Sequence, residues 1–325
     1  MDRRILWVLM ILSVYTFQTL AQTSCQNKAS YKIAAVVQYQ TKYINYTIEG
    51  ILKYFSSSKC FQVQSFLTNN DRFLEFETVH NLVKKKFDGI ALFPVDAQSI
   101  HYCGLLAKYS NVPLVDLFGD KGLNARAYLT SLAIVDSEKI GKMIANYLLK
   151  NSKPGKTIVI QAFFTEGFST GVSNGLSKTL NNTKFTIVFN GQGFYSNQVS
   201  KTIIKQALTE YPDATSIITF SGEMGNGVAD YLKEQHIKTK THISVDMNDV
   251  LEKYIRENVY VQASAYYSGA LAGYSMAYSL KRKILGNKFL YAKNIPVIVV
   301  TKQNIDGVLM QNPYRYPQFA NKIVF

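Results

Sequence analysis

The sequence predicts an α/β fold of two similar lobes, each a parallel sheet flanked by helices. Short apolar runs alternate with helical patterns at a spacing of about 30 residues, which suits a strand, a crossover helix and a return strand. In the segment Lys84–Ile100 a polar helix end runs into an apolar strand, then Pro94, and then Asp96 opens a new helix. The units form two series, and 325 residues that are 47% hydrophobic can bury two cores.

The first series extends from Tyr31 to Leu117. Its expected strands are residues 31–38, 61–67, 89–93 and 112–117. Between the first three, apolar residues recur at helical spacing from Ile44 to Phe55 and from Phe73 to Val83. Strands that alternate with helices in this way predict a parallel sheet covered on both faces.

The second series starts near Asp136. Either Asp136 or Ser137 can cap a helix that runs through Leu149. The expected strands are residues 157–163, 185–189, 216–220, 242–246 and 259–263, and the expected helices begin near residue 169 and span residues 196–211 and 268–285. The repetition of the same units indicates a second lobe like the first.

The N-terminal residues 1–21 read as a secretion signal. Arg3 and Arg4 precede an unbroken apolar stretch, and a small-x-small pattern ends at Ala21, which leaves Gln22 as the first mature residue. The apolar stretch is short for a membrane span, although an uncleaved anchor stays open, and a lipoprotein reading through Cys25 is weak. We therefore expect a soluble, exported protein, either periplasmic or extracellular.

Export permits a disulfide among the three cysteines. Cys25 precedes the first expected strand and Cys60 the second, and neighbouring parallel strands start at the same edge of a sheet. A Cys25–Cys60 disulfide and three unpaired thiols are both open. Cys103 lies inside an apolar helical pattern and is expected to be a buried thiol. The sequons at Asn45 and Asn181 matter only for a eukaryotic source.

The formal net charge of +14 comes from 36 basic and 22 acidic residues. The lysines are scattered, and the tight clusters Lys84–Lys86 and Lys281–Lys283 lie near helix ends, where cations suit the helix dipole. This pattern favours a solvated surface over a nucleic-acid interface.

Signals of catalysis are weak, so we expect a protein that is not an enzyme and needs no cofactor or metal. The four histidines are dispersed without metal-ligand spacing. The glycine-rich stretch Gly222–Gly227 lacks the lysine and hydroxyl residue of a phosphate-binding loop.

Ligands of open parallel sheets bind beyond the carboxyl ends of the strands. The segments at those ends are residues 38–45, 94–96, 116–118, 163–170, 194–195, 221–223 and 246–248. They are polar and aromatic, as a sugar-like ligand requires, because carboxylates and amides bind hydroxyl groups and aromatic rings cover C–H surfaces.

The chain resembles the type I periplasmic binding proteins, especially their ribose-binding branch, over about residues 31–307. The resemblance lies in five segments in register: residues 88–100, 111–117, 135–148, 211–232 and 296–308. It implies two lobes joined by three crossing segments, with residues 31–132 and 266–296 in the first and 133–265 and 297–325 in the second. It also implies a monomer that closes on a small sugar-like ligand and delivers it to an ABC-transporter permease or a sensor.

The resemblance assigns site residues as well. Asp116 and Asp246 fall on the family's sugar-binding aspartates, and Tyr195 falls on an aromatic wall position. Further expected ligand contacts are Ser221, Tyr266, Lys42 and Asn45.

Two arginines of ribose-like binders are replaced here by Leu117 and Val172. The loss of these multiple donors favours a different sugar, a sugar derivative or a less polar solute. The alternative is an interaction protein that kept the fold and uses its basic surface on an anionic macromolecule. A saturable small ligand would favour the first function, and salt-sensitive binding to an anionic polymer the second.

Overall fold

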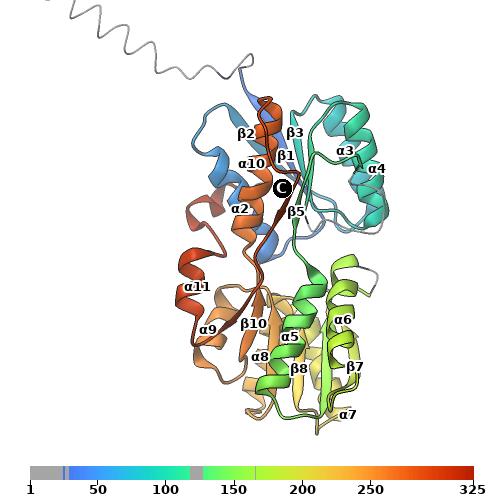
Figure 1. Cartoon of the computed structure of the whole chain (residues 1–325), viewed down its shortest axis with the longest axis vertical. Helices are drawn as coiled ribbons and strands as arrows, with labels where there is room; N and C mark the ends of the chain where they lie inside the picture. Colours follow the sequence, from blue (N-terminus) through green and yellow to red (C-terminus); the bar gives the residue numbers. More distant parts are fainter. Residues whose placement is uncertain (1–24, 26–28, 118–126, 165) are drawn as a thin grey trace, which may run out of the picture.

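The computed structural model describes residue 25 and residues 29–117, 127–164 and 166–325, and these form two α/β lobes stacked end to end (Figure 1). The secretion signal expected at residues 1–21 lies outside the described residues. Among the helices that are described, none combines the length and the apolar character that a membrane crossing needs.

The sheet of the first lobe has six strands in the order β11-β5-β4-β3-β1-β2, and all of its strand pairs are parallel. These strands are β1 (Tyr31–Val37), β2 (Phe61–Leu67), β3 (Gly89–Leu92), β4 (Leu114–Leu117), β5 (Ser131–Ile134) and β11 (Ala292–Asn294). The central strands β3 and β4 are buried on both faces, which explains their continuous apolar sequences.

The sheet of the second lobe repeats this plan in the order β12-β10-β9-β8-β6-β7, and its edge strand β12 is antiparallel. Its strands are β6 (Lys156–Gln161), β7 (Thr186–Gln192), β8 (Ser216–Thr219), β9 (Thr241–Val245), β10 (Ala263–Tyr266) and β12 (Ile298–Thr301). The same order in both sheets confirms the prediction of two similar lobes.

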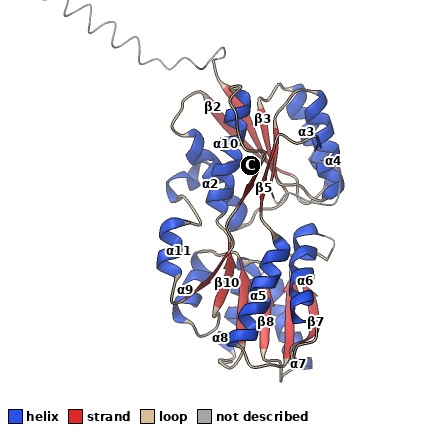
Figure 2. Ribbon diagram, viewed as in Figure 1, coloured by secondary structure: helices blue, strands red, loops and turns tan. Residues whose placement is uncertain are grey.

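Helices cover both faces of each sheet (Figure 2). In the first lobe, α2 (Lys42–Phe55) and α10 (Gly269–Ile284) pack together, and α3 (Arg72–Lys84) packs with α4 (Ala97–Tyr109). In the second lobe, α5 (Ser137–Asn151) packs with α6 (Gly167–Leu180), and α7 (Asn197–Glu210) packs with α8 (Gly222–Glu234). The shorter helices are α9 (Asp249–Glu257), α11 (Ile305–Gln311) and the 3-10 helix η2 (Pro317–Lys322).

Side-chain caps fix where most of these helices begin. Asp96 Oδ1 accepts a hydrogen bond from the backbone N–H of Ser99 at the start of α4, as the sequence predicts. Asp136 caps α5 through the backbone N–H of Lys139, so Ser137 is the first helical residue and not the cap. The other capping side chains belong to Thr41, Asp71, Ser196, Ser221, Asn248 and Ser268. Each cap stands at a strand-to-helix turn, at the edge of the sheet that faces the other lobe.

A disulfide joins Cys25 to Cys60, so the N-terminal segment is tied to the start of β2. The backbone N–H of Tyr31 donates to the carbonyl of Cys60 at 2.7 Å beside it. Cys103 is a buried free thiol in α4.

Some expected boundaries are wrong. The expected strand at residues 259–263 is instead β10 at Ala263–Tyr266, and the sequence reading missed β5 and β12, each of four residues. Strand β5 follows a segment without helical spacing, so no strand–helix unit marks it in the sequence. Its pairing with β4 and β11 identifies it as a strand.

The chain crosses between the lobes after β5, after β10 and between β11 and β12 (Figure 1). The expectation that all of residues 297–325 lie with the second lobe is wrong at the end of the chain. There η2 packs on α2 of the first lobe, and the backbone N–H of Tyr316 donates to Glu49 Oε2 at 2.6 Å. The tail therefore makes a fourth crossing.

Candidate functional site

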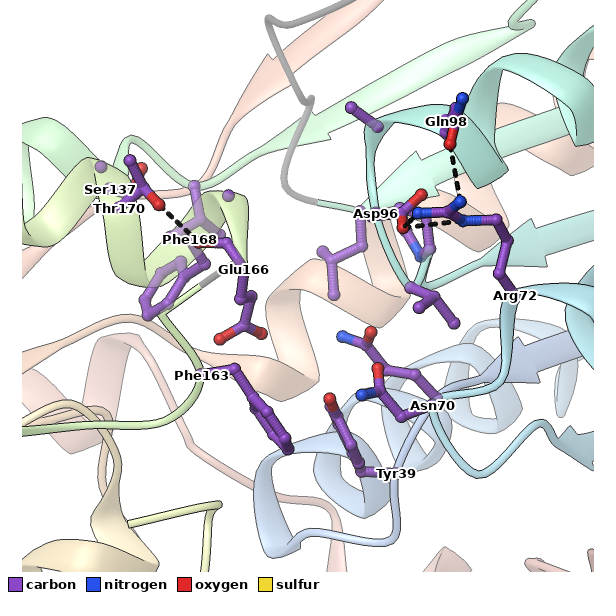
Figure 3. A pocket seen from close by; sticks show the side chains of 18 of the residues that line it. Tyr39, Asn70, Arg72, Asp96, Gln98, Ser137, Phe163, Glu166, Phe168 and Thr170 are labelled. Atoms are coloured by element: carbon purple, nitrogen blue, oxygen red, sulfur yellow. Dashed lines mark hydrogen bonds and ion pairs between the residues drawn. The ribbon is translucent and has the colours of Figure 1, made fainter. Parts of the chain in front are cut away.

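A cleft of about 1400 Å³ opens between the two lobes, and we call it the outer cleft (Figure 3). Both lobes contribute strand ends and helix starts to its wall. Its polar and aromatic lining includes Gln38, Tyr39, Asn70, Arg72, Asp96 and Gln98 from the first lobe and Asp136, Phe163, Glu166, Phe168, Thr170 and Asn174 from the second. The strand-end rule therefore predicted the edge of both sheets at which this cleft opens.

On the first-lobe side, Arg72 is held by two partners. Its Nε donates to Asp96 Oδ2 at 2.9 Å, and its Nη1 donates to Gln98 Oε1 at 2.6 Å (Figure 3). Because the capping carboxylate of Asp96 already neutralises it, this guanidinium is fixed in the wall of the outer cleft.

On the second-lobe side, the carboxylate of Glu166 points into the outer cleft towards Tyr39 and Asn70 (Figure 3). The Tyr195 hydroxyl donates to Glu166 Oε1 at 2.5 Å, and the Ser169 hydroxyl donates to Oε2 at 2.9 Å. Burial raises the pKa of Glu166 above its usual value, against the effect of these two hydrogen bonds.

An aromatic stack connects the lobes at the base of the outer cleft. The rings of Tyr39 and Phe163 are 5.5 Å apart and nearly parallel, and the ring of Tyr195 lies 5.2 Å from that of Tyr39. Phe194 and Tyr195 have φ angles of 51° and 54°. A left-handed backbone is unusual for bulky residues, and such strain gathers at functional sites.

Behind this stack lies an inner cavity of about 30 Å³. Its lining residues are Gln38, Tyr39, Thr41, Tyr43, Ile44, Phe168, Tyr195, Phe220, Glu223, Asp246 and Tyr267. Gln38, Tyr39 and Phe168 also line the outer cleft, so the two spaces adjoin.

Two buried carboxylates face the inner cavity. Asp246 Oδ1 accepts a hydrogen bond from the backbone N–H of Gly222 at 2.7 Å, and Glu223 Oε1 accepts one from the backbone N–H of Lys42 at 2.7 Å. Burial raises the pKa of Asp246 well above its usual value, and the charge of Glu223 adds to this rise. Burial also raises the pKa of Glu223.

Lys42 links the lobes beside the inner cavity. Its ammonium group forms an ion pair with Asp249 at the start of α9, and its backbone N–H donates a hydrogen bond to Glu223 of α8. Of the expected residues, Tyr195 and Asp246 therefore line the inner cavity, whereas Lys42 lies beside it and lines neither space.

We predict that Lys42→Met shifts the protein towards more open lobes. A half-exposed ion pair contributes about 0.2–1 kcal/mol, which corresponds to a rise of roughly 1.4- to fivefold in the open-to-closed ratio. Single-molecule FRET between one dye in each lobe measures this ratio. Lys156→Met is the matched control, because it removes a similarly exposed ion pair, to Asp213, within the second lobe. An equal effect of both substitutions would contradict the interlobe role.

The expectation that Asp116 contacts the ligand stays a prediction, and the described cavities do not favour it. Asp116 lies inside β4, is 1% exposed and lines neither space, whereas its neighbour Leu117 lines the outer cleft. Successive side chains of a strand point to opposite faces, so an error of one position moves the carboxylate to the other face. There it lies close enough to Glu75 to raise that residue's pKa.

The side chains of Tyr266 and Ser221 also form hydrogen bonds within the protein. The Tyr266 hydroxyl donates to the carbonyl of Asn312 at 2.5 Å, and the adjacent Tyr267 lines the inner cavity instead. Ser221 caps α8 through the backbone N–H of Met224. These residues, like Asp116, lie next to cavity-lining positions without lining a cavity themselves.

Asn45 lies on α2 and lines neither space. The hydroxyl of its sequon partner Thr47 is buried and donates to the carbonyl of Tyr43 at 3.0 Å. Asn181, at the end of α6, is exposed.

The sequence reading missed Asn70, Arg72 and Gln98. Asn70 and Arg72 follow β2, so the strand-end rule would have found them had it been applied to the second strand as well. Gln98 lies in the first turn of α4, two residues beyond its expected cap.

Within the described ranges, no three histidine, cysteine, aspartate or glutamate side chains are grouped so that they could hold a metal ion.

Residues 33–288 match the family described as "Periplasmic binding protein domain". No curated protein matches the chain. Solved structures with the same fold include an ABC-transporter solute-binding protein from Agrobacterium vitis with bound D-fucose (18% identity, TM-score 0.80, 86% of this chain and 99% of that one). Another is a glucose-galactose binding protein from Geobacillus stearothermophilus (15% identity, TM-score 0.75, 86% of this chain and 99% of that one). A third is a solute-binding protein from Bacillus halodurans with bound myo-inositol (13% identity, TM-score 0.77, 88% of this chain and 99% of that one).

Proposed function

Because the chain belongs to the periplasmic binding protein family, we propose that it is an exported protein that binds a small solute between its two lobes. The observation that carries this proposal is the outer cleft of about 1400 Å³, whose walls come from both lobes. Closing the lobes on a solute would bury it between two rigid sheets, and this couples binding to a change of shape.

The lining of the cleft supports a sugar, a polyol or a derivative of one. Tyr39, Phe163 and Phe168 offer ring faces to C–H surfaces, and Asn70, Gln98 and Asn174 offer amides to hydroxyl groups. The similar structures hold D-fucose and myo-inositol, which have the same mixture of surfaces.

The protein's partner in this function is a membrane permease of an ABC transporter or a sensor that recognises the closed lobes. The protein is a carrier and not an enzyme. The expected secretion signal at residues 1–21 and the Cys25–Cys60 disulfide support a periplasmic or extracellular location, because disulfides persist in oxidising compartments.

A thermal-shift screen of the chain from Gln22 against monosaccharides, sugar alcohols and nucleosides tests the proposal. A solute at about 100 times its dissociation constant should stabilise the folded state by roughly 2.7 kcal/mol, which raises the melting temperature measurably. Asp246→Asn should weaken the binding of a hit at least about tenfold, since it removes a charged acceptor from the inner cavity.

Asp116→Asn is the matched control, because this aspartate is equally buried but lines neither space. Equal loss of affinity in both variants would contradict the site assignment. If no solute binds, salt-sensitive binding to heparin is the next measurement, because it tests the basic surface against an anionic macromolecule.

A further inference from the structure

Acceptor groups converge on the inner cavity from several elements. Asp246 follows β9, and Glu223 lies in the first turn of α8. The Glu166 carboxylate accepts a hydrogen bond from the hydroxyl of the cavity-lining Tyr195. All three carboxylates also lie close enough to the buried Tyr267 to raise its pKa, after the larger effect of burial. The inner cavity therefore lies among three carboxylates.

Gln38 adds a fourth acceptor. It is only 5% exposed, it lines both the inner cavity and the outer cleft, and its Oε1 accepts no hydrogen bond from the described part of the chain. A buried acceptor without a donor costs about 1–3 kcal/mol, so its presence indicates that a donor arrives from outside the described part of the chain, as a ligand in the cleft could provide.

Among the described residues, two cationic side chains close to these spaces, those of Lys42 and Arg72, are already paired. The Lys42 ammonium pairs with Asp249, and the Arg72 guanidinium pairs with Asp96. This excess of negative over positive groups is local to the inner cavity, because the chain as a whole carries a formal charge of +14. Placing an uncompensated carboxylate pair in a buried site is costly, and a ligand that carries a positive charge would offset that cost.

The rest of the inner cavity suits an ammonium group. Aromatic residues make up just over half of its lining, namely Tyr39, Tyr43, Phe168, Tyr195, Phe220 and Tyr267. Aromatic rings attract cations through their faces. An ammonium group is also a pure donor with three N–H bonds, the complement of a wall rich in acceptors.

The sizes of the two spaces define the remainder of the ligand. The inner cavity of about 30 Å³ admits a group the size of one or two water molecules and no sugar ring. The adjoining outer cleft of about 1400 Å³ has room for a larger polar body.

We infer that the solute is a hydroxylated amine, an amino sugar or amino alcohol, whose ammonium group occupies the inner cavity while its hydroxylated body lies in the outer cleft. This inference rests on the proposed function and narrows its ligand class.

Isothermal titration calorimetry near neutral pH tests it with matched pairs: D-glucosamine against D-glucose, D-galactosamine against D-galactose, and ethanolamine against ethylene glycol. At least one amine should bind about tenfold or more tightly than its neutral counterpart. Asp246→Asn should reduce this preference, whereas Asp213→Asn, which alters an exposed carboxylate paired with Lys156, should leave it unchanged.

Equal or tighter binding of the neutral counterparts would overturn the inference and leave the proposed solute-binding function intact. The absence of binding by every amine would also overturn it, and the separate screen of neutral solutes would then decide the function. Binding of Ca²⁺ alone, with loss of that binding in Asp246→Asn, would overturn it in favour of an inorganic cation.

Discussion

Replacing Gly50 with alanine should destabilise the first lobe by about 3 kcal/mol or more. An added Cβ at Gly50 would lie 2.0 Å from the carbonyl oxygen of Ala270, and one at Gly273 would lie 1.8 Å from that of Thr47. Thus α2 and α10 contact each other backbone to backbone at this crossing, and neither backbone can move aside as a flexible side chain would. Urea-induced unfolding of the two proteins measures the difference.

Gly307→Ala is the matched control, because nothing lies within 4 Å of its Cβ position in α11. Since alanine is the better helix former, this variant should be as stable as the unsubstituted protein or more stable by up to about 1 kcal/mol. Free energies of unfolding that agree within about 0.5 kcal/mol for Gly50→Ala and the unsubstituted protein would show that the helices can separate at little cost.

The effect of Gly50→Ala should extend to the relation between the lobes. The crossing segment after β10 leads directly into α10, and η2 packs on α2 from the other side. A forced separation of these helices would therefore displace two of the connections between the lobes. We expect lower solute affinity in this variant in addition to lower stability.

Glu75→Gln should remove much of the dependence of stability on pH. Glu75 is a fully buried residue of α3, and its carboxyl group accepts hydrogen bonds from the Ser99 hydroxyl of α4 and from the backbone N–H of Val95, the latter at 3.0 Å. Burial raises the pKa of Glu75 to about 9, and the charges of Asp96 and Asp116 add to this rise.

The direction in which the free energy of unfolding changes with pH follows from proton linkage. Between the unfolded pKa of about 4.3 and the folded pKa, only the folded state holds the proton, so the free energy of unfolding falls as pH rises. The maximum slope from one group is about 1.4 kcal/mol per pH unit, so Glu75 should account for a loss of roughly 3–4 kcal/mol between about pH 5 and about pH 8.

Glutamine has the shape of the protonated side chain, and the Ser99 hydroxyl can rotate to accept from its amide. The Glu75→Gln variant should therefore be the more stable protein near pH 8, with the difference vanishing near pH 4. Urea-induced unfolding across this range measures it, with Glu77→Gln, an exposed position of the same helix, as the control. A constant difference between Glu75→Gln and the unsubstituted protein at all pH values would contradict this account.

The elements that the sequence predicts well carry strong local signals. Asp96 and Asp136 cap α4 and α5, because a short carboxylate before a helical pattern satisfies free backbone N–H groups. The apolar runs that became β1 and β2 are seven residues long, enough to be distinguished from loops. Strand β5 gave no such signal, since it follows a segment without helical spacing and is defined by its pairing with β4 and β11.

The candidate site, too, was predicted only in part from the sequence. The strand-end rule found the edge of the sheet, and with it Tyr195 and Asp246, which the structure places at the inner cavity. The rule does not distinguish neighbouring residues such as Asp116 and Leu117. A shift of one position along a strand moves a side chain to the other face of the sheet, and here Leu117 lines the outer cleft while Asp116 does not.

By itself, the sequence determined the class of fold, the repetition of two lobes and the edge of each sheet where a solute can bind, because periodicity, caps and strand ends are local properties of the chain. The tertiary structure alone decided that the Lys42 ammonium pairs with Asp249 across the lobes, and that the Oε1 of Gln38, a residue lining both cavities, has no donor among the described residues. It also decided that Glu166, Glu223 and Asp246 all lie close enough to Tyr267 to raise its pKa. These residues are far apart in the chain, and their proximity depends on how two separately folded sheets face each other, which no local pattern records.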